Sequence, residues 1–197
     1  MFTGIIQGIG RIAALKRRGE TAQLTITTPL TGSQHSQLGD SVAIDGICLT
    51  ITALTPEGFT TTVMPETIRR TNLAERTVGD RVDLELALAA TGRLDGHFVL
   101  GHVDTTGELV SRVNDQNAVV LRFAFPKTQR PYIVEKGSIA INGVSLTVTT
   151  VTAMTFGVSL IPHTVQETVL GDLQLGQRVN LETDILGKYI VAQEALT

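Results

Sequence analysis

The chain repeats itself at an offset of 97 residues, and this repeat limits the possible folds more than any other feature of the sequence. Residues 41–85 align without a gap on residues 138–182, with 18 identical pairs among 45 positions. Unrelated sequences of average composition would share roughly three pairs. The 197 residues are therefore expected to form two copies of one module, at about 1–90 and 98–184, and not one large domain.

Each copy is predicted to be β-structure. Segments 23–27, 41–44, 49–54 and 59–63 alternate apolar residues with threonine or small residues, and Gly, Pro or Asp separates them. Threonine suits strands because its branched Cβ restricts χ1. Five or six short strands in one copy are too few for two wide sheets. We therefore expect an all-β fold in which each copy closes into a small barrel without exposed edges.

Short helices are expected beside the barrels. One is predicted over 66–73, after Pro65, and its repeat over 163–170. A further helix of about a dozen residues begins near Asp184 and has no partner in the first copy. A single barrel would not obviously cover its apolar stripe, which suggests self-association. The stripe contains Ile185, Leu186, Tyr189, Ile190 and Leu196.

Composition excludes several classes of function. Hydrophobic residues make up 42% of the chain and charged residues 18%, which favours a packed core over a disordered chain. The formal charge of -3 leaves no basic surplus for nucleic-acid phosphates. Trp is absent, and with only eight Phe or Tyr residues the chain has few side chains that can stack on nucleic-acid bases. Nucleic acid is therefore not expected as a partner.

The single cysteine, Cys48, cannot form an internal disulfide, which fits a reducing, cytoplasmic compartment. Residues 1–10 contain no basic leader before an apolar stretch, and no run of 18 apolar residues occurs. Secretion and membrane spanning are therefore disfavoured. No Cys/His cluster has the spacing of a zinc site, so no metal is expected.

The differences between the copies carry more functional information than the shared residues. Cys48 aligns with Ser145, and Ile5 aligns with His102. If both barrels keep a pocket, the two pockets share a shape but differ in reactive groups. That arrangement would suit two related ligands in different roles, and the alternative is simple drift after duplication.

Three groups of residues resemble the riboflavin synthase family (alpha chain) across nearly the whole sequence. They are the opening residues 1–5, the paired motifs 46–50 and 143–147, and the Gly-His-x-x-x-Gly-His-Val-Asp run at 96–104. The resemblance implies two six-stranded Greek-key barrels, a C-terminal helix and a homotrimer. We expect barrels at 1–95 and 96–184, and an oligomerisation helix at 185–197.

The implied reaction is a dismutation in which two molecules of 6,7-dimethyl-8-ribityllumazine exchange a four-carbon unit. One molecule becomes riboflavin and the other becomes 5-amino-6-(ribitylamino)uracil, as the last step of riboflavin biosynthesis. The resemblance implies no cofactor. It also implies a site between neighbouring chains, in which two stacked pteridines meet different side chains, and association with lumazine synthase is a further expected partnership.

The resemblance assigns substrate contacts to both barrels. Those of the first barrel fall on Gly4, Ile5, Ile6, Ser41, Cys48, Leu49, Thr50, Thr62, Val63, Met64, Pro65, Glu66 and Thr67. Those of the second barrel fall on Gly101, His102, Val103, Lys136, Ser145, Leu146, Thr147, Ile161, Pro162, His163, Thr164, Val165 and Gln166. Hydroxyl and backbone groups of four threonines are expected to bind pteridine edges: Thr50, Thr67, Thr147 and Thr164.

Six residues are candidates for the chemistry: His102, Cys48, Ser41, Ser145, Thr147 and Asp184. His102 is the expected base or proton shuttle, because imidazole titrates near neutrality. Cys48 is either a thiolate nucleophile or a small apolar residue of the pocket wall. Ser145 and Thr147 are expected to position ligand and proton. Ser41 and Asp184 resemble polar interface residues of the family, although Asp184 could instead form a salt bridge at the barrel edge.

The other histidines receive no catalytic role. His97 lies at the domain junction and His35 in a polar loop, so both are predicted to be structural. His163 adjoins the predicted pocket, and its position alone assigns it no role.

Two other classes of protein remain as alternatives. Non-catalytic lumazine-binding antenna proteins share this pattern but depart from it at the cysteine, histidine and second Ser-Leu-Thr positions, which match the enzyme here. A structural tandem barrel would have large side chains filling both pockets. Leu86 and Asp95 depart from the commonest enzyme pattern, which has arginine and glycine there, and this puts the linker geometry in doubt.

Overall fold

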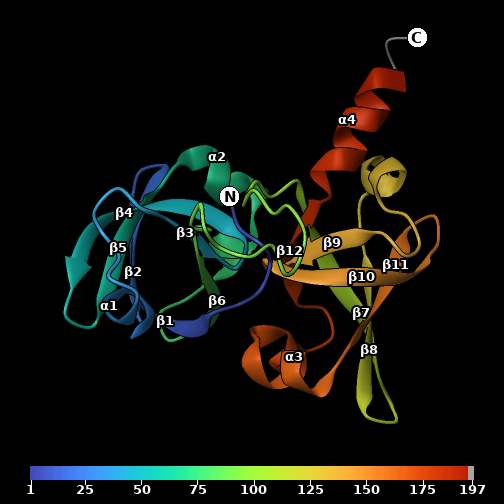
Figure 1. Ribbon diagram of the computed structural model, residues 1–197, viewed down its shortest axis with the longest axis horizontal. Helices are drawn as coiled ribbons and strands as arrows, with labels where there is room; N and C mark the ends of the chain where they lie inside the picture. The colour runs from blue at the N-terminus through green and yellow to red at the C-terminus, as the bar shows by residue number, and fades with distance from the viewer. Residues whose placement is uncertain (195–197) are drawn as a thin grey trace.

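The computed structural model describes residues 1–194 and shows two closed six-stranded antiparallel barrels side by side (Figure 1). The first barrel contains β1 (Gly8–Arg18), β2 (Thr21–Thr27), β3 (Ser41–Ile44), β4 (Ile47–Thr55), β5 (Gly58–Val63) and β6 (Arg81–Leu86). The second contains β7 (Thr105–Asp115), β8 (Ala118–Ala124), β9 (Ser138–Ile141), β10 (Val144–Val151), β11 (Thr155–Leu160) and β12 (Arg178–Thr183). The all-β prediction is confirmed.

Both barrels have the same topology, which the sequence repeat predicts. Around the first barrel the order is β1-β2-β5-β4-β3-β6, and around the second it is β7-β8-β11-β10-β9-β12. Register shifts also repeat: the one between Ile12 and Ala14 recurs between Leu109 and Ser111. Because a bulge bends a strand and increases its twist, its repetition gives both barrels the same curvature.

Helical segments lie between the strands and at the end of the chain. They are α1 (Leu30–Ser33), α2 (Pro65–Arg70), η1 (Asn72–Glu75), η2 (Lys127–Tyr132), α3 (Pro162–Glu167), η3 (Val169–Asp172) and α4 (Ile185–Glu194). The single helix predicted over 66–73 is therefore an α-helix followed by a 3-10 turn. Thr71 adopts an extended conformation between them, and its side chain accepts a hydrogen bond from the backbone of Leu73.

The terminal helix α4 projects away from the second barrel, near η2 (Figure 1). Tyr189 is 71% exposed and Ile190 60% exposed, so the apolar stripe predicted on this helix is uncovered in the single chain. Leu196, the last residue of that predicted stripe, lies outside the described residues. Within residues 1–194, no helix has both the length and the apolar character needed to cross a membrane.

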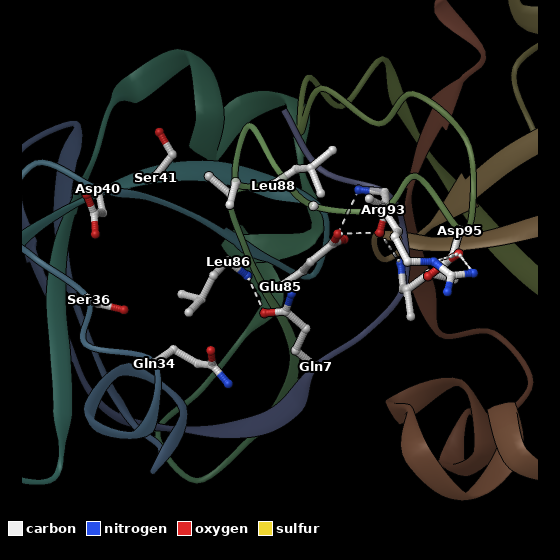
Figure 2. Close-up of a pocket in the computed structure, with 15 residues that line it drawn as sticks. Gln7, Gln34, Ser36, Asp40, Ser41, Glu85, Leu86, Leu88, Arg93 and Asp95 are labelled. Atoms are coloured by element: carbon white, nitrogen blue, oxygen red, sulfur yellow. Dashed lines mark hydrogen bonds and ion pairs between the residues drawn. The ribbon is translucent and has the colours of Figure 1, made fainter.

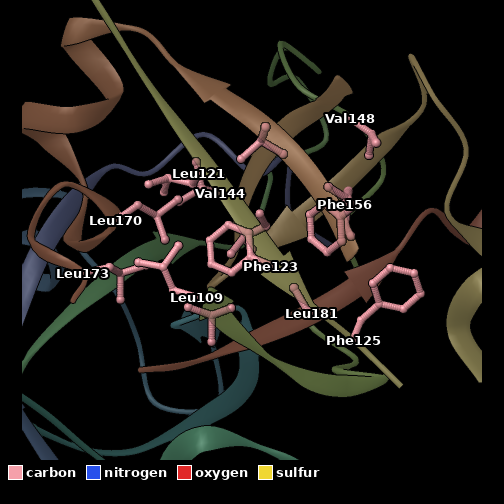
Figure 3. Close-up of a cluster of buried hydrophobic side chains, with 14 of the residues drawn as sticks. Leu109, Leu121, Phe123, Phe125, Val144, Val148, Phe156, Leu170, Leu173 and Leu181 are labelled. Carbon is pink, nitrogen blue, oxygen red and sulfur yellow. The ribbon is translucent and has the colours of Figure 1, made fainter. Parts of the chain in front are cut away.

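Each barrel has its own core. The second core contains Phe123, Phe125 and Phe156, and the Phe156 ring centroid lies 5.6 Å from that of Phe123 and 5.8 Å from that of Phe125 (Figure 3). In the first core the only aromatic side chain of the cluster is Phe59, which is fully buried among aliphatic residues.

A third apolar cluster joins the barrels. Phe2 and Val99 form an isolated antiparallel bridge and pack with Ala43 and Ala140. Phe2 and Val99 are 97 residues apart, and so are Ala43 and Ala140. Equivalent residues therefore meet at an approximate twofold axis between the repeats. The same axis passes Gly46 and Gly143, which lie so close that a Cβ on Gly46 would come within 2.5 Å of the Gly143 nitrogen. The two repeats therefore contact each other through equivalent surfaces.

Candidate functional site

Two short segments of the chain cross from their own repeat to the other barrel. The carbonyl of Gly101 accepts a hydrogen bond from the Cys48 N–H at 2.9 Å, and Val103 packs against the first core. In the equivalent place, the Gly4 carbonyl accepts from the Ser145 N–H at 2.8 Å, and Ile6 packs against the second core.

This crossing corrects one sequence-based expectation. Residues 101–103 were expected to serve the second barrel and Gly4 and Ile6 the first, whereas the structure places Gly101 and Val103 against the first barrel and Gly4 and Ile6 against the second. Each segment precedes the first strand of its own barrel, and local sequence contains no signal that it lies against the other. This segment also keeps contact with the first barrel, since the Gly4 N–H donates to Glu85 on β6 and Ile5 lines a cavity with Ser41.

The first barrel therefore presents a face built from both repeats, here called the first face. Cys48 and His102 line one cavity of about 190 Å³ with Glu66, Thr67 and Val103, and Ile47, Thr71 and Gly101 complete its wall. Gly101 lies at φ +77, and a Cβ there would come within 2.5 Å of the Cys48 Cβ. A glycine at this position lets the backbone pass directly over the cysteine, which brings the neighbouring imidazole to the same cavity.

A row of hydroxyls continues the first face across three strands. Ser41 on β3 pairs with Thr50 on β4, and because Ile51 pairs with Thr61, Thr50 lies beside Thr62 on β5. Ser41 is half-buried, whereas Thr50 and Thr62 point to the outside of the barrel and are exposed. Alternate residues of these strands enter the core, so the row is an outer surface of hydrogen-bonding groups.

The second barrel presents the equivalent second face around Ser145. The Nδ1 atom of His97 lies 2.7 Å from the Ser145 hydroxyl, so His97 contacts a candidate site residue, which the prediction of a purely structural role did not include. Burial lowers the pKa of His97, and the nearby Asp184 carboxylate opposes that change. A neutral imidazole at this position can accept the serine proton or donate to the serine oxygen.

The hydroxyl row of the second face includes two residues that sequence reasoning missed. Thr147 on β10 pairs with Ser138 on β9, and because Val148 pairs with Val158, Thr147 also lies beside Ser159. Ser138 and Ser159 are the repeats of Ser41 and Thr62, so the 97-residue offset was a signal that could have identified them.

The four threonines expected to bind ligand differ in exposure but share one property. Thr50 and Thr147 are exposed, and Thr67 and Thr164 are half-buried. Across residues 1–194, none of their hydroxyls hydrogen-bonds to another protein atom, whereas the Thr71 hydroxyl donates to the Thr67 carbonyl. The four hydroxyls are therefore available to a ligand.

Asp184 begins the terminal helix and faces the second barrel. Its carboxylate accepts a hydrogen bond from the Leu186 N–H at 3.0 Å, which is a helix-capping contact. Among the described residues its carboxylate takes part in no ion pair. Among the remaining predicted contacts of the second barrel, Leu146 and Thr147 follow Ser145 on β10, and Lys136 donates its backbone N–H to the Val148 carbonyl. Residues 161–166 comprise the residue before α3 and most of that helix.

A larger cavity of about 690 Å³ adjoins the first face (Figure 2). Ser41, Glu85 and Leu86 line it together with residues 87–89, Gly92, Arg93 and Asp95 of the linker, and Figure 2 shows Arg93 and Asp95 at its linker end. Neither Cys48 nor His102 reaches it. The smaller cavity holds both candidate reactive groups and is therefore the better candidate for the chemistry, whereas Ser41 lines the larger one.

Two buried glutamates hold the crossing segments, and sequence reasoning missed both. Glu182 on β12 accepts hydrogen bonds from the N–H groups of Leu100, Gly101 and His102. Its repeat, Glu85 on β6, accepts from the N–H groups of Thr3 and Gly4 and from the Thr3 hydroxyl. Burial raises the pKa of each carboxyl, and these hydrogen bonds oppose the rise.

Among the described residues, no group of His, Cys, Asp and Glu side chains is arranged to hold a metal ion. The polar groups of both faces are hydroxyls, a thiol, imidazoles and the carboxylates of Glu66 and Asp184. They are suited to hydrogen bonding and to proton transfer with an uncharged heterocycle.

Comparison with known proteins connects this geometry to a class of ligand-binding proteins. The family model described as "Lumazine binding domain" matches residues 3–87 and again residues 100–184, one match for each barrel. The crystal structure of LumP complexed with riboflavin has a TM-score of 0.86 and 25% identity, and the match covers 93% of this chain and 99% of that one. The fold and its two faces thus define a tandem lumazine-binding protein.

Curated relatives narrow this class. The riboflavin synthase of Actinobacillus pleuropneumoniae is 48% identical over 191 residues, which cover 96% of this chain and 88% of the relative. The riboflavin synthase of Bacillus subtilis (strain 168) is 45% identical with the same coverage. The chain belongs to the riboflavin synthase family.

Proposed function

We propose that the chain is a riboflavin synthase that converts two molecules of 6,7-dimethyl-8-ribityllumazine into riboflavin and 5-amino-6-(ribitylamino)uracil. The observation that carries this proposal is the meeting of His102 and Cys48 in one cavity, at the end of a hydroxyl row. A related face around Ser145 repeats the arrangement with different reactive groups. Two faces of one shape suit two molecules of one substrate.

In this reaction the four-carbon unit of one lumazine is transferred to the other, so the two products together contain all the atoms of the two substrates. The 7-methyl group of lumazine is acidic because its carbanion delocalises into the ring, and a base of moderate strength is sufficient to remove a proton. His102 is placed to accept that proton and return one later. Cys48 lies where a thiolate could add to the ring or where a small side chain could simply bound the cavity.

The second face is proposed to hold and orient the other substrate. The Ser145 hydroxyl, fixed by His97 at 2.7 Å, and the Thr147 hydroxyl can hydrogen-bond the ring edge and position a proton. Ser41 and Asp184 contribute polar groups at the border of the first and second faces respectively. Holding both rings in register turns a bimolecular encounter into a step within one complex, which supplies much of the rate.

We further propose that the chain assembles as a homotrimer whose sites form between the first face of one chain and the second face of its neighbour. Exposed residues of both faces and the uncovered apolar stripe of α4 support this assembly. In this proposal residues 1–95 and 96–184 are the two lumazine-binding domains, and 185–197 is the oligomerisation segment.

The free thiol of Cys48 supports a cytoplasmic location. Association with lumazine synthase, which would supply the substrate directly, is part of the same proposal.

Incubation of the purified chain with the lumazine tests the function. We expect flavin absorbance to appear while lumazine is consumed, with two molecules lost for each riboflavin formed. A second candidate function is that of a non-catalytic antenna protein. The likeness of the fold to LumP favours it, but the chain is 25% identical to LumP and 48% identical to the riboflavin synthase of Actinobacillus pleuropneumoniae. Tight stoichiometric binding with unchanged lumazine fluorescence would select that candidate.

A further inference from the structure

The loop that carries His102 is held by one buried carboxylate on β12 of its own barrel, the strand that pairs with β7. Glu182 on β12 is 4% exposed. Its Oε1 accepts from the Leu100 N–H at 2.7 Å, and its Oε2 accepts from the Gly101 and His102 N–H groups at 2.9 and 3.0 Å. Three consecutive amides therefore point at one side chain, in the geometry of a backbone anion site.

The far end of this loop is fixed separately. The Asp104 N–H donates to the Leu181 carbonyl at 2.9 Å, and the Asp104 carboxylate accepts from the Thr183 N–H at 2.8 Å. Lys188 of α4 approaches the same carboxylate at 2.7 Å. These contacts hold the start of β7, and the Phe2–Val99 bridge holds the residue before the loop. Between these two anchors, residues 100–102 are held by Glu182 and by the hydrogen bond from the Cys48 N–H.

We propose that Glu182 is a positioning residue for the reaction, because its carboxylate fixes the backbone that places the His102 imidazole in the cavity with Cys48. The expected effect of Glu182 on turnover rests on the proposed function. The effect of Glu182 on the position of His102 rests on geometry alone. Glu182 touches neither the cavity nor a ligand face, so it acts only through the loop.

The repeat supplies a matched comparison for this role. Glu85 makes the same three-donor contact to Thr3 and Gly4, with distances of 2.6 to 2.9 Å, and it holds a loop that carries Ile5 where the other carries His102. The two glutamates lie 97 positions apart, and both are buried. Loss of Glu85 should disturb the second face, to which Gly4, Ile6 and His97 belong, without moving the His102 imidazole.

Replacing Glu182 by glutamine tests the proposal, since the amide is nearly isosteric but turns one acceptor oxygen into a donor. At least one of the three N–H groups then loses its partner, and the loop is no longer held. We expect kcat to fall by about 10- to 100-fold with KM changed less than about threefold, because a displaced catalytic group mainly lowers the rate of the bound complex.

A double-mutant cycle separates positioning from general damage. If Glu182 acts through His102, Glu182→Gln in a His102→Gln background should lower kcat by less than about twofold. Glu85→Gln, the control, should instead raise KM and retain its full effect in the same background. Additive losses for Glu182→Gln, or a wild-type kcat in the folded variant, would overturn the proposal.

An NMR readout does not depend on turnover and so separates this inference from the proposed function. In the wild-type chain, nuclear Overhauser contacts should connect Gly101 with Cys48, and the amides of 100–102 should exchange slowly. Glu182→Gln should remove these contacts and shift the His102 ring signals, while Glu85→Gln leaves them in place. If the wild-type chain shows no flavin formation, the proposed function fails, but these signals still decide the position of His102.

Should Glu182→Gln fail to fold, Glu182→Asp provides the second variant, because it keeps the charge and shortens the reach by one methylene. The same loss of kcat and the same change in His102 signals are expected. Should both fail to fold, the wild-type exchange rates remain decisive, and rapid exchange at all three amides would contradict the proposal.

Discussion

The two barrels share strand order, bulges and buried glutamates, yet their faces differ in the groups that carry chemistry. The first face brings Cys48 and His102 to one cavity, whereas the second places Ser145 against His97 and has Ile5 in the slot of His102. The shared residues mostly lie in strands, turns and the contact between repeats. The comparison indicates that the fold is maintained in both copies while the side chains of the two faces have diverged, which is the basis of the separate roles proposed for them.

The largest difference expected between the faces concerns proton transfer. His102→Gln should lower turnover by about 10²- to 10⁴-fold, because it removes the only imidazole that lines the described cavity of the first face. Flavin absorbance measures the rate. His35→Gln, in an exposed loop, is the control and should retain normal turnover. Full activity of His102→Gln would show that the two faces do not differ in this way.

The contact between the repeats offers a comparison of stability. Asp83 and Asn180 are equivalent, and each accepts one backbone N–H, from Val169 at 2.9 Å and Asn72 at 2.8 Å. The Asn180 Nδ2 also donates to a carbonyl, whereas the buried Asp83 Oδ2 has no hydrogen-bond partner among residues 1–194. Burial, reinforced by the negative charge of Asp45, raises the pKa of Asp83 well above its usual value.

At pH values above the raised pKa of Asp83, Asp83→Asn should therefore stabilise the protein by about 1–3 kcal/mol, the range for an unsatisfied buried polar group. Because the folded chain holds the Asp83 proton more tightly than the unfolded chain, its contribution is complete below about pH 4 and is lost as pH rises through the raised pKa. Asparagine removes this dependence. Arg76 and Arg81, the cations near Asp83, are unchanged in the variant. Urea unfolding at several pH values measures the effect, and parallel pH profiles for both proteins would contradict it.

The two cores should also respond differently to loss of a ring. Phe156 contacts two other rings, whereas Phe59 packs among aliphatic side chains. Phe156→Leu should cost about 1 kcal/mol more than Phe59→Leu, because aromatic pairs contribute about 0.5–1.5 kcal/mol beyond the area they bury. Chemical unfolding compares the two variants. Equal losses would mean that ring contacts do not distinguish the cores.

The smallest expected effect is at the slot where the faces hold cysteine and serine. Cys48→Ser makes the first face resemble the second at this position, and Cys48→Ala removes the reactive atom. If the thiol only bounds the cavity, both variants should keep turnover within about tenfold of wild type. A loss of about 10³-fold in both would instead assign Cys48 a covalent role.

The sequence predicted the tandem barrels because the repeat and the alternation of apolar residues with threonine are local and periodic signals. It also predicted which residues surround Cys48 and Ser145 on their own strands. It could not place residues 101–103 on the first barrel, because that contact depends on how the repeats pack. The roles of Glu85 and Glu182 could not be predicted for the same reason. Each glutamate accepts hydrogen bonds from backbone groups 80 or more positions away, and the sequence does not show which distant residues meet.

A complementation assay tests most directly whether one reaction needs both faces from neighbouring chains. Thr50→Tyr should block the first face and Thr147→Tyr the second, and each variant alone should be inactive. When the two are unfolded, mixed equally and reassembled, about a quarter of the interfaces pair an intact first face with an intact second face, so about a quarter of wild-type turnover should return. No recovery in properly assembled mixtures, or full activity of either variant alone, would contradict the account.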